Sequence, residues 1–196
     1  MKRFFAEHSY DMVKMLLNQI VISIFGFSLV LATMKAENVT LRNLSSFFSI
    51  LFYLFLLYMM TWEIGYKDKI AVEQGRKARN PFRGLLISLC ANSVNFLCAI
   101  FITLKAFLPN VGALTSIGDV CQALTVFLQG MYTGVLTNAV GGVILNKYWF
   151  VYFLTPLPAM LICALAYQLG VHDVKHSAFF QKNQYPESDR ETKKKG

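Results

Sequence analysis

Four apolar runs of about twenty residues each alternate with short segments that hold most of the charged side chains. The runs cover residues 12–33, 47–63, 84–106 and 149–170. A helix rises about 1.5 Å per residue, so a run of this length crosses a hydrocarbon core of roughly 30 Å. A soluble domain would carry charges along its whole length, whereas here the 15% of residues that are charged gather between the runs. The pattern predicts an all-α protein, a polytopic membrane helix bundle.

The segment of residues 64–83, IGYKDKIAVEQGRKARNPFR, is the most basic stretch between two runs and reads as a charged loop. Basic residues beside membrane spans are retained in the cytoplasm, so we expect this segment there. Its cations would bind anionic lipid headgroups of the bilayer or an acidic partner. The same explanation covers the net charge of +8, and no nucleic-acid partner is expected. The basic residues are Lys67, Lys69, Arg76, Lys77, Arg79 and Arg83.

The distribution of lysine and arginine discriminates between four and five membrane crossings. With four spans, fifteen of the nineteen basic residues lie on the side of the 64–83 segment and four lie outside. A fifth crossing, at residues 116–136, would change this division to ten and nine and remove the bias that orients membrane proteins. We therefore expect four spans in a cell (inner) membrane, with the N- and C-termini both cytoplasmic.

Polar side chains form a face on two of the runs. Gln19 and Ser23 share one side of the first run, and Asn92 and Asn95 lie one turn apart near the middle of the third. An unpaired amide in hydrocarbon is costly, so these groups need partners, and the two pairs are candidates for each other or for a neighbouring subunit. We favour hydrogen bonds that join helices over contacts to a solute. The second run has no comparable face and is expected to contact mainly lipid.

The segment of residues 116–136 is amphipathic, and its polar stripe includes Asp119, Gln122 and Gln129. It could lie in the interface, re-enter the membrane from outside, or cross it with the stripe inward. Ser116 and Asp119 have the spacing of a capping box, which favours a helix start at this point. We expect an interfacial or re-entrant helix in addition to the four spans.

The chain is expected to form one transmembrane domain over residues 1–176. Pro156 and Pro158 should kink the last span, which also carries a face of small residues suited to close helix packing. Residues 177–196 have no apolar face, which predicts a disordered cytoplasmic tail.

The common sequence patterns of enzymes are absent from the chain. It has no GxxxxGK[ST], GxGxxG, HExxH or GxSxG, and its four cysteines include no CxxC pair. No catalytic, cofactor-binding or metal-binding residue can be assigned, so we expect a non-enzymatic protein without a cofactor.

Three stretches within residues 62–96 carry a family resemblance: WEIGYKDKI, GRKARNPFRG and ANSVNF. Together they resemble small uncharacterised bacterial integral membrane proteins of comparable length. The resemblance implies a bacterial inner-membrane setting and carries no function, cofactor or site residue.

Two functions are compatible with these observations. The first is a membrane subunit or scaffold that packs its small-residue faces against partner helices or a second copy of the chain. The alternative is a small-solute transporter or substrate-binding membrane component, in which Gln19, Asn92 and Asn95 contact the solute and residues 116–136 form a gate. A wet cavity at Asn92 and Asn95 would favour transport, whereas a dry hydrogen-bonded contact would favour the scaffold.

Overall fold

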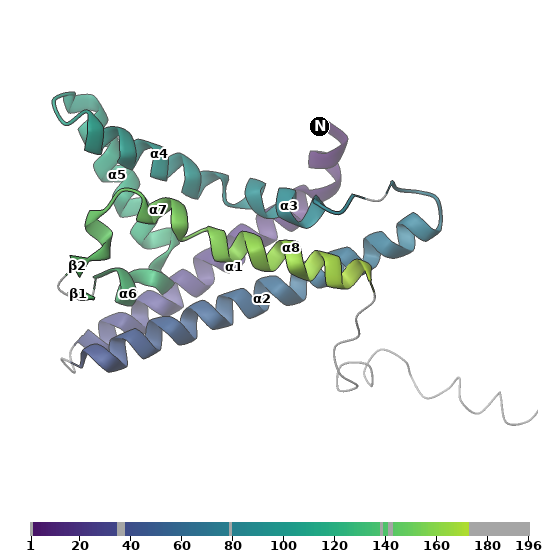
Figure 1. The fold of residues 1–196 in the computed structure, drawn as a ribbon, viewed down its shortest axis with the longest axis horizontal. Helices are drawn as coiled ribbons and strands as arrows, with labels where there is room; N and C mark the ends of the chain where they lie inside the picture. Colours follow the sequence, from purple (N-terminus) through teal and green to yellow (C-terminus); the bar gives the residue numbers. More distant parts are fainter. Residues whose placement is uncertain (1, 35–37, 79, 138, 141–142, 173–196) are drawn as a thin grey trace, which may run out of the picture.

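The computed structural model describes residues 2–34, 38–78, 80–137, 139–140 and 143–172. Arg79 and the predicted tail of residues 177–196 lie outside these described residues. The elements form one elongated helical bundle (Figure 1). They are α1 Lys2–Met34, α2 Val39–Glu73, α3 Arg83–Ala91, α4 Ser93–Phe107, α5 Gly112–Leu128, η1 Gly130–Tyr132, α6 Thr133–Thr137, β1 Ala139–Val140, β2 Val143–Ile144, η2 Leu145–Lys147, α7 Val151–Leu154 and α8 Leu157–Val171.

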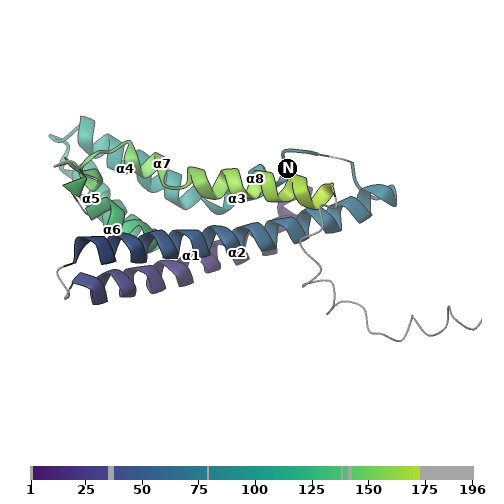
Figure 2. The same cartoon turned by 60° about the horizontal axis from the view of Figure 1, so that its bottom comes forward.

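Helices α1 and α2 form a long hairpin along one side of the bundle, as two views show (Figures 1 and 2). The side chain of Asn38 caps the start of α2 by accepting a hydrogen bond from the Leu41 N–H at 3.1 Å. Gly75 follows the end of α2 with a φ of 70°, a conformation that glycine adopts without steric cost. Local signals in the sequence therefore fix both ends of this helix.

Helix α2 continues through residues 64–73, so the expectation of a loop over all of 64–83 is wrong for its first half. The charges there support the helix, because Glu63 pairs with Lys67 at 2.6 Å and Glu73 with Lys69 at 3.9 Å, each one turn apart. At 1.5 Å per residue, the 35 residues of α2 extend roughly 50 Å, well beyond a hydrocarbon core. The charged turns of α2 consequently project past the apolar run.

Helix α8 packs directly on α2, backbone against backbone. A Cβ atom added at Gly65 would overlap the Tyr167 carbonyl, and one added at Gly170 would overlap the Trp62 carbonyl. The expectation that the second run has no packing face is therefore wrong, since α2 buries a stripe of residues, although most of its apolar window lies on the outside of the bundle. The residues of this stripe recur every three or four positions, as on one face of a helix, and they include both small and bulky side chains. They are Ser46, Ser49, Tyr53, Leu57, Thr61, Gly65 and Asp68.

The third run is not one helix, because α3 and α4 meet at Asn92 with a bend of 57°. The Asn92 side-chain amide donates to the Ser88 carbonyl at 2.9 Å, the same oxygen that accepts the Asn92 backbone N–H. Short polar side chains that bond to nearby backbone compete with regular helix geometry. The unbroken helix expected over residues 84–106 is accordingly replaced by two shorter ones.

After α4 the chain turns back as α5, and an ion pair between Lys105 and Asp119 ties the two helices. Asp119 lies in the middle of α5, which begins at Gly112, so the predicted capping box is wrong. An 80° bend then separates α5 from the segment 130–137. There Gly130 packs on Ser23 in the middle of α1, whereas Gly134 packs on Ser46 near the start of α2. The chain therefore turns by about a right angle at Gln129 and continues toward the start of α2.

A short hairpin of β1 and β2 leads to α7 and α8, which are separated at Thr155 and Pro156. This interruption lies where Pro156 and Pro158 predict a kink, and residues Val151–Val171 still form a single candidate span. Within the described residues, three helical segments are long and apolar enough to cross a membrane, and up to five if each bent pair counts as one span. Many large apolar side chains cover the outside of the bundle, as expected for a membrane protein.

Candidate functional site

Three helix breaks meet at one place inside the bundle. Asn92 marks the break between α3 and α4, Gln129 the break after α5, and Thr155 the break between α7 and α8. All three residues line a single narrow void, and no part of this void is wide enough for a water molecule. The other lining residues are Gln19, Tyr53, Met131, Tyr132, Pro156 and Ala159.

Side chains of α1 donate hydrogen bonds to a backbone carbonyl at the end of α5. The Leu128 carbonyl is left without a helical N–H partner because α5 ends there. Gln19 donates its side-chain Nε2–H to this oxygen at 3.1 Å, and the Ser23 hydroxyl donates to the same oxygen. Both side chains are buried, so they act as a cap for α5 supplied by another helix.

The two asparagines of the third run bond to each other, and no hydrogen bond joins them to Gln19 or Ser23 among the described residues. Asn95 donates its Nδ2–H to the Asn92 Oδ1 at 2.9 Å, while Asn92 donates to Ser88. Asn92 and Gln19 nevertheless line the same void from opposite helices, whereas Asn95 does not line it. The structure thus brings together two of the four residues expected at the polar core.

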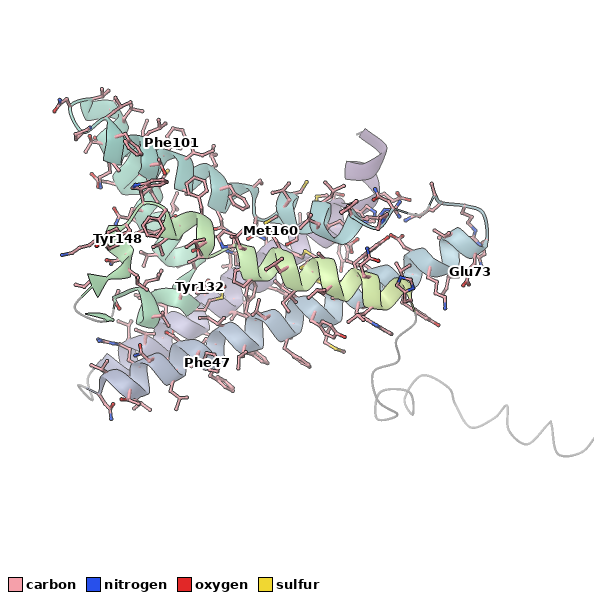
Figure 3. The ribbon with its side chains drawn as sticks, viewed as in Figure 1. Phe47, Glu73, Phe101, Tyr132, Tyr148 and Met160 are labelled. Carbon is pink, nitrogen blue, oxygen red and sulfur yellow. The ribbon has the colours of Figure 1, made fainter. Side chains whose placement is uncertain are left out.

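Several buried polar atoms at or near the void have no hydrogen-bond partner among the described residues. They are both amide atoms of Gln129, the Tyr132 hydroxyl and the Asn95 Oδ1. Gln129 is only 2% exposed, and Tyr132 lies inside the bundle between α7 and α2 (Figure 3). An unpaired buried amide costs roughly 1–3 kcal/mol. The void therefore has unused hydrogen-bonding capacity, concentrated in Gln129.

The polar stripe of the 116–136 segment divides between two places. Asp119 and Gln122 lie at the far end of α4, where Gln122 accepts from Lys105 at 3.3 Å and donates to the Tyr152 hydroxyl at 3.2 Å. Only Gln129 reaches the void. Thr155 belongs to the small-residue face expected on the last span. Tyr53 and Tyr132 were not singled out from the sequence, because aromatic residues within an apolar run carry no distinctive signal.

A second polar cluster surrounds Asp68, beyond the apolar run of α2. The Asp68 carboxylate accepts hydrogen bonds from Lys77 and Arg83 at 2.7 Å each and from the Tyr167 hydroxyl at 3.0 Å. Lys77 also pairs with Glu7 of α1 at 3.1 Å. Burial raises the pKa of the Asp68 carboxyl, but the bonds from Lys77 and Arg83 outweigh it, and the net pKa lies below its ordinary value.

This cluster changes the interpretation of the predicted basic face. Lys67, Lys69, Lys77 and Arg83 each pair with a carboxylate of the same chain, and Arg76 is exposed. A wider cavity, with about 180 Å³ of space that water can enter, opens beside Asp68, between α2 and α8. Its walls mix acidic, basic and apolar side chains, and none of the unpaired buried polar atoms recorded for the described residues lies in them. The void at the helix breaks is therefore the better candidate for a binding site.

Within the described part of the chain, no three His, Cys, Asp or Glu residues lie close enough to hold a metal ion. Comparison with protein-family models, with curated proteins and with solved structures finds no match to the chain. The geometry of the described residues is consequently the basis for assigning the candidate site.

Proposed function

We propose that this protein is a small-solute transporter or substrate-binding membrane component that binds a polar solute at the void between the three helix breaks. The observation that carries the proposal is the nearly complete burial of Gln129, with both amide atoms unpaired, where three interrupted helices converge. Interrupted helices at membrane depth occur where they line a binding site or are buried in protein. Gln19 and Asn92 would complete the polar wall.

For the membrane arrangement we propose four spans, formed by α1, α2, the α3–α4 pair and the α7–α8 pair. The α5–α6 pair is then a re-entrant arm that enters from outside and returns. Support comes from the contacts of Gly130 with the middle of α1 and of Gly134 with the start of α2. The charge distribution of the sequence supports the same count.

Reporter fusions test this arrangement in a bacterial inner membrane. We expect alkaline phosphatase, which is active only outside the cytoplasm, to be active when inserted after Asn110 and inactive when fused after Gly196. A green fluorescent protein fused after Gly196 should fluoresce, which controls for expression. Active phosphatase after Gly196 would instead indicate a fifth crossing by residues 116–136.

A solute pathway predicts intermittent water access to the void. In a chain whose four native cysteines are replaced, we introduce Thr155→Cys and measure its modification by hydroxyethyl methanethiosulfonate in vesicles. Thiolate is the reactive form, and it requires a hydrated environment. We expect the rate to exceed, by at least about tenfold, that of Leu161→Cys, whose parent residue is 63% exposed on the outside of α8.

The matched controls decide how that experiment is interpreted. Leu161→Cys reports reaction through lipid, and Gln74→Cys, at the exposed end of α2, reports full access to water. If Thr155→Cys reacts no faster than Leu161→Cys from either side of the membrane, the void is permanently dry. That result would contradict solute binding and favour the membrane subunit.

A membrane subunit or scaffold is the second candidate. The void is closed to water and most of its polar groups bond within the chain, which is the dry contact expected of a scaffold. The unpaired amide of Gln129 is the observation that favours solute binding instead. The small-residue faces, however, are already occupied. Gly26 of α1 packs against Met131, where a Cβ would come within 2.6 Å of the Met131 Cα, and Thr61 and Cys163 join α2 to α8 with a contact of 3.4 Å. Faces used inside the bundle are not available to a partner helix, which makes this candidate weaker.

A further inference from the structure

The chemistry of the void limits what kind of solute fits it, and this inference rests on the function proposed above. None of the described residues that line the void is Asp, Glu, Lys, Arg or His. A charged solute would lose its hydration there without gaining an opposite charge, which is the most costly form of burial. The site therefore selects for a neutral molecule.

The unpaired hydrogen-bonding groups of the void determine which polar groups a solute must present to them. Gln19 and Ser23 are committed to the Leu128 carbonyl, and Asn92 is committed to Ser88 and Asn95. Gln129 retains a donor, Nε2, and an acceptor, Oε1, on one planar group. A partner that presents an acceptor and a donor side by side satisfies both atoms at once, as another amide does.

Most of the remaining lining is apolar or aromatic. Tyr53, Tyr132, Pro156 and Ala159 line the same void as Gln129, and Met131 contributes a flexible side chain. Because the void is too narrow for water, a solute enters only when side chains move, and Met131 is the lining residue best suited to move. The lining therefore suits a small apolar body beside the hydrogen-bonding edge.

We propose that the site binds a small neutral molecule with a carboxamide, lactam or urea edge on an apolar body, held by Gln129 through a paired donor and acceptor. The Tyr132 hydroxyl, which is also unpaired, supplies a third hydrogen bond. Benzamide is the simplest probe of this class. Benzoate, with a charge in place of the amide, and benzyl alcohol, with a single hydroxyl, are matched comparisons.

The test is saturable binding of tritiated benzamide to the full-length protein in lipid nanodiscs at pH 7. We expect unlabelled benzamide to displace the label, and benzoate and benzyl alcohol to compete at least about tenfold less well, because they leave Gln129 unpaired. Gln129→Leu should weaken binding at least about tenfold. Gln74→Leu, the same substitution at an exposed glutamine, should leave binding unchanged.

A second variant keeps the test decisive if Gln129→Leu does not fold. Tyr132→Phe removes only a hydroxyl that has no partner, so it should fold normally and weaken benzamide binding roughly three- to tenfold. Benzoate or benzyl alcohol binding as tightly as benzamide would reject the amide class and leave the solute site in place. If none of the three compounds binds saturably, the inference fails, while Thr155→Cys labelling still reports on the proposed function.

Discussion

Asp68→Asn should lower the free energy of unfolding of the purified protein by about 3 kcal/mol, measured by denaturation in detergent micelles. The Asp68 side chain is 5% exposed and accepts hydrogen bonds from Lys77, Arg83 and Tyr167, which belong to three different segments. Neutralising the carboxylate leaves two cations partly buried without their common counter-charge. Breaking a buried ion pair from one side is among the most destabilising single changes known.

The matched control on the same helix is Glu73→Gln. Glu73 also pairs with a lysine, but its side chain is 63% exposed, so the change should stay within about 0.5 kcal/mol. Acid provides an independent check, because the pKa of Asp68 is lowered in the folded protein. The contribution of Asp68 to the free energy of unfolding is therefore complete above roughly pH 4, and it is lost as the pH falls through the pKa that Asp68 has in the folded protein. Equal losses for Asp68→Asn and Glu73→Gln would show that the cluster does not hold the segments together.

The second large effect is expected at the contact between α2 and α8. Gly65→Ala places a Cβ against the backbone carbonyl of Tyr167, and a carbonyl in a packed helix cannot move aside as a flexible side chain can. We expect a loss of roughly 2–3 kcal/mol, seen as a lower thermal midpoint in detergent. The alanine gains up to about 1 kcal/mol of helix propensity, so the measured loss is already the net value.

Gly112→Ala is the control for that substitution, since nothing lies within 4 Å of a Cβ at this position. Its stability should be unchanged or rise by up to about 1 kcal/mol. A midpoint for Gly65→Ala equal to or above that of Gly112→Ala would mean that α2 and α8 are not in backbone contact.

Composition and periodicity anticipate much of the fold, because helix formation is mostly local. The all-α class and the interruption of the last span near Pro156 both follow from residues within a turn or two of each other. These features depend on interactions between residues that are close in the sequence. Length and hydropathy alone permit three to five spans within the described residues, so they do not fix the number.

The candidate site is harder to anticipate because it depends on contacts between distant segments. Asn92 and Gln129 were singled out as polar residues in apolar runs, but nothing nearby in the sequence indicates that both face Gln19 across one void. The bends at these residues were also missed, since a regular 100° repeat assumes an unbroken helix. Tyr53 and Tyr132 become candidate site residues only because the fold places them in the lining of the same void.

The cap that α1 provides for α5 has a consequence during synthesis. Gln19 and its acceptor, the Leu128 carbonyl, are separated by 109 positions along the chain. At 5–20 residues per second, a ribosome needs roughly 5–20 s to deliver the second after the first. Throughout that interval the Gln19 amide and the Ser23 hydroxyl lack the acceptor that they have in the folded protein. We therefore expect retention of the first helix in the bilayer to depend on the insertion machinery.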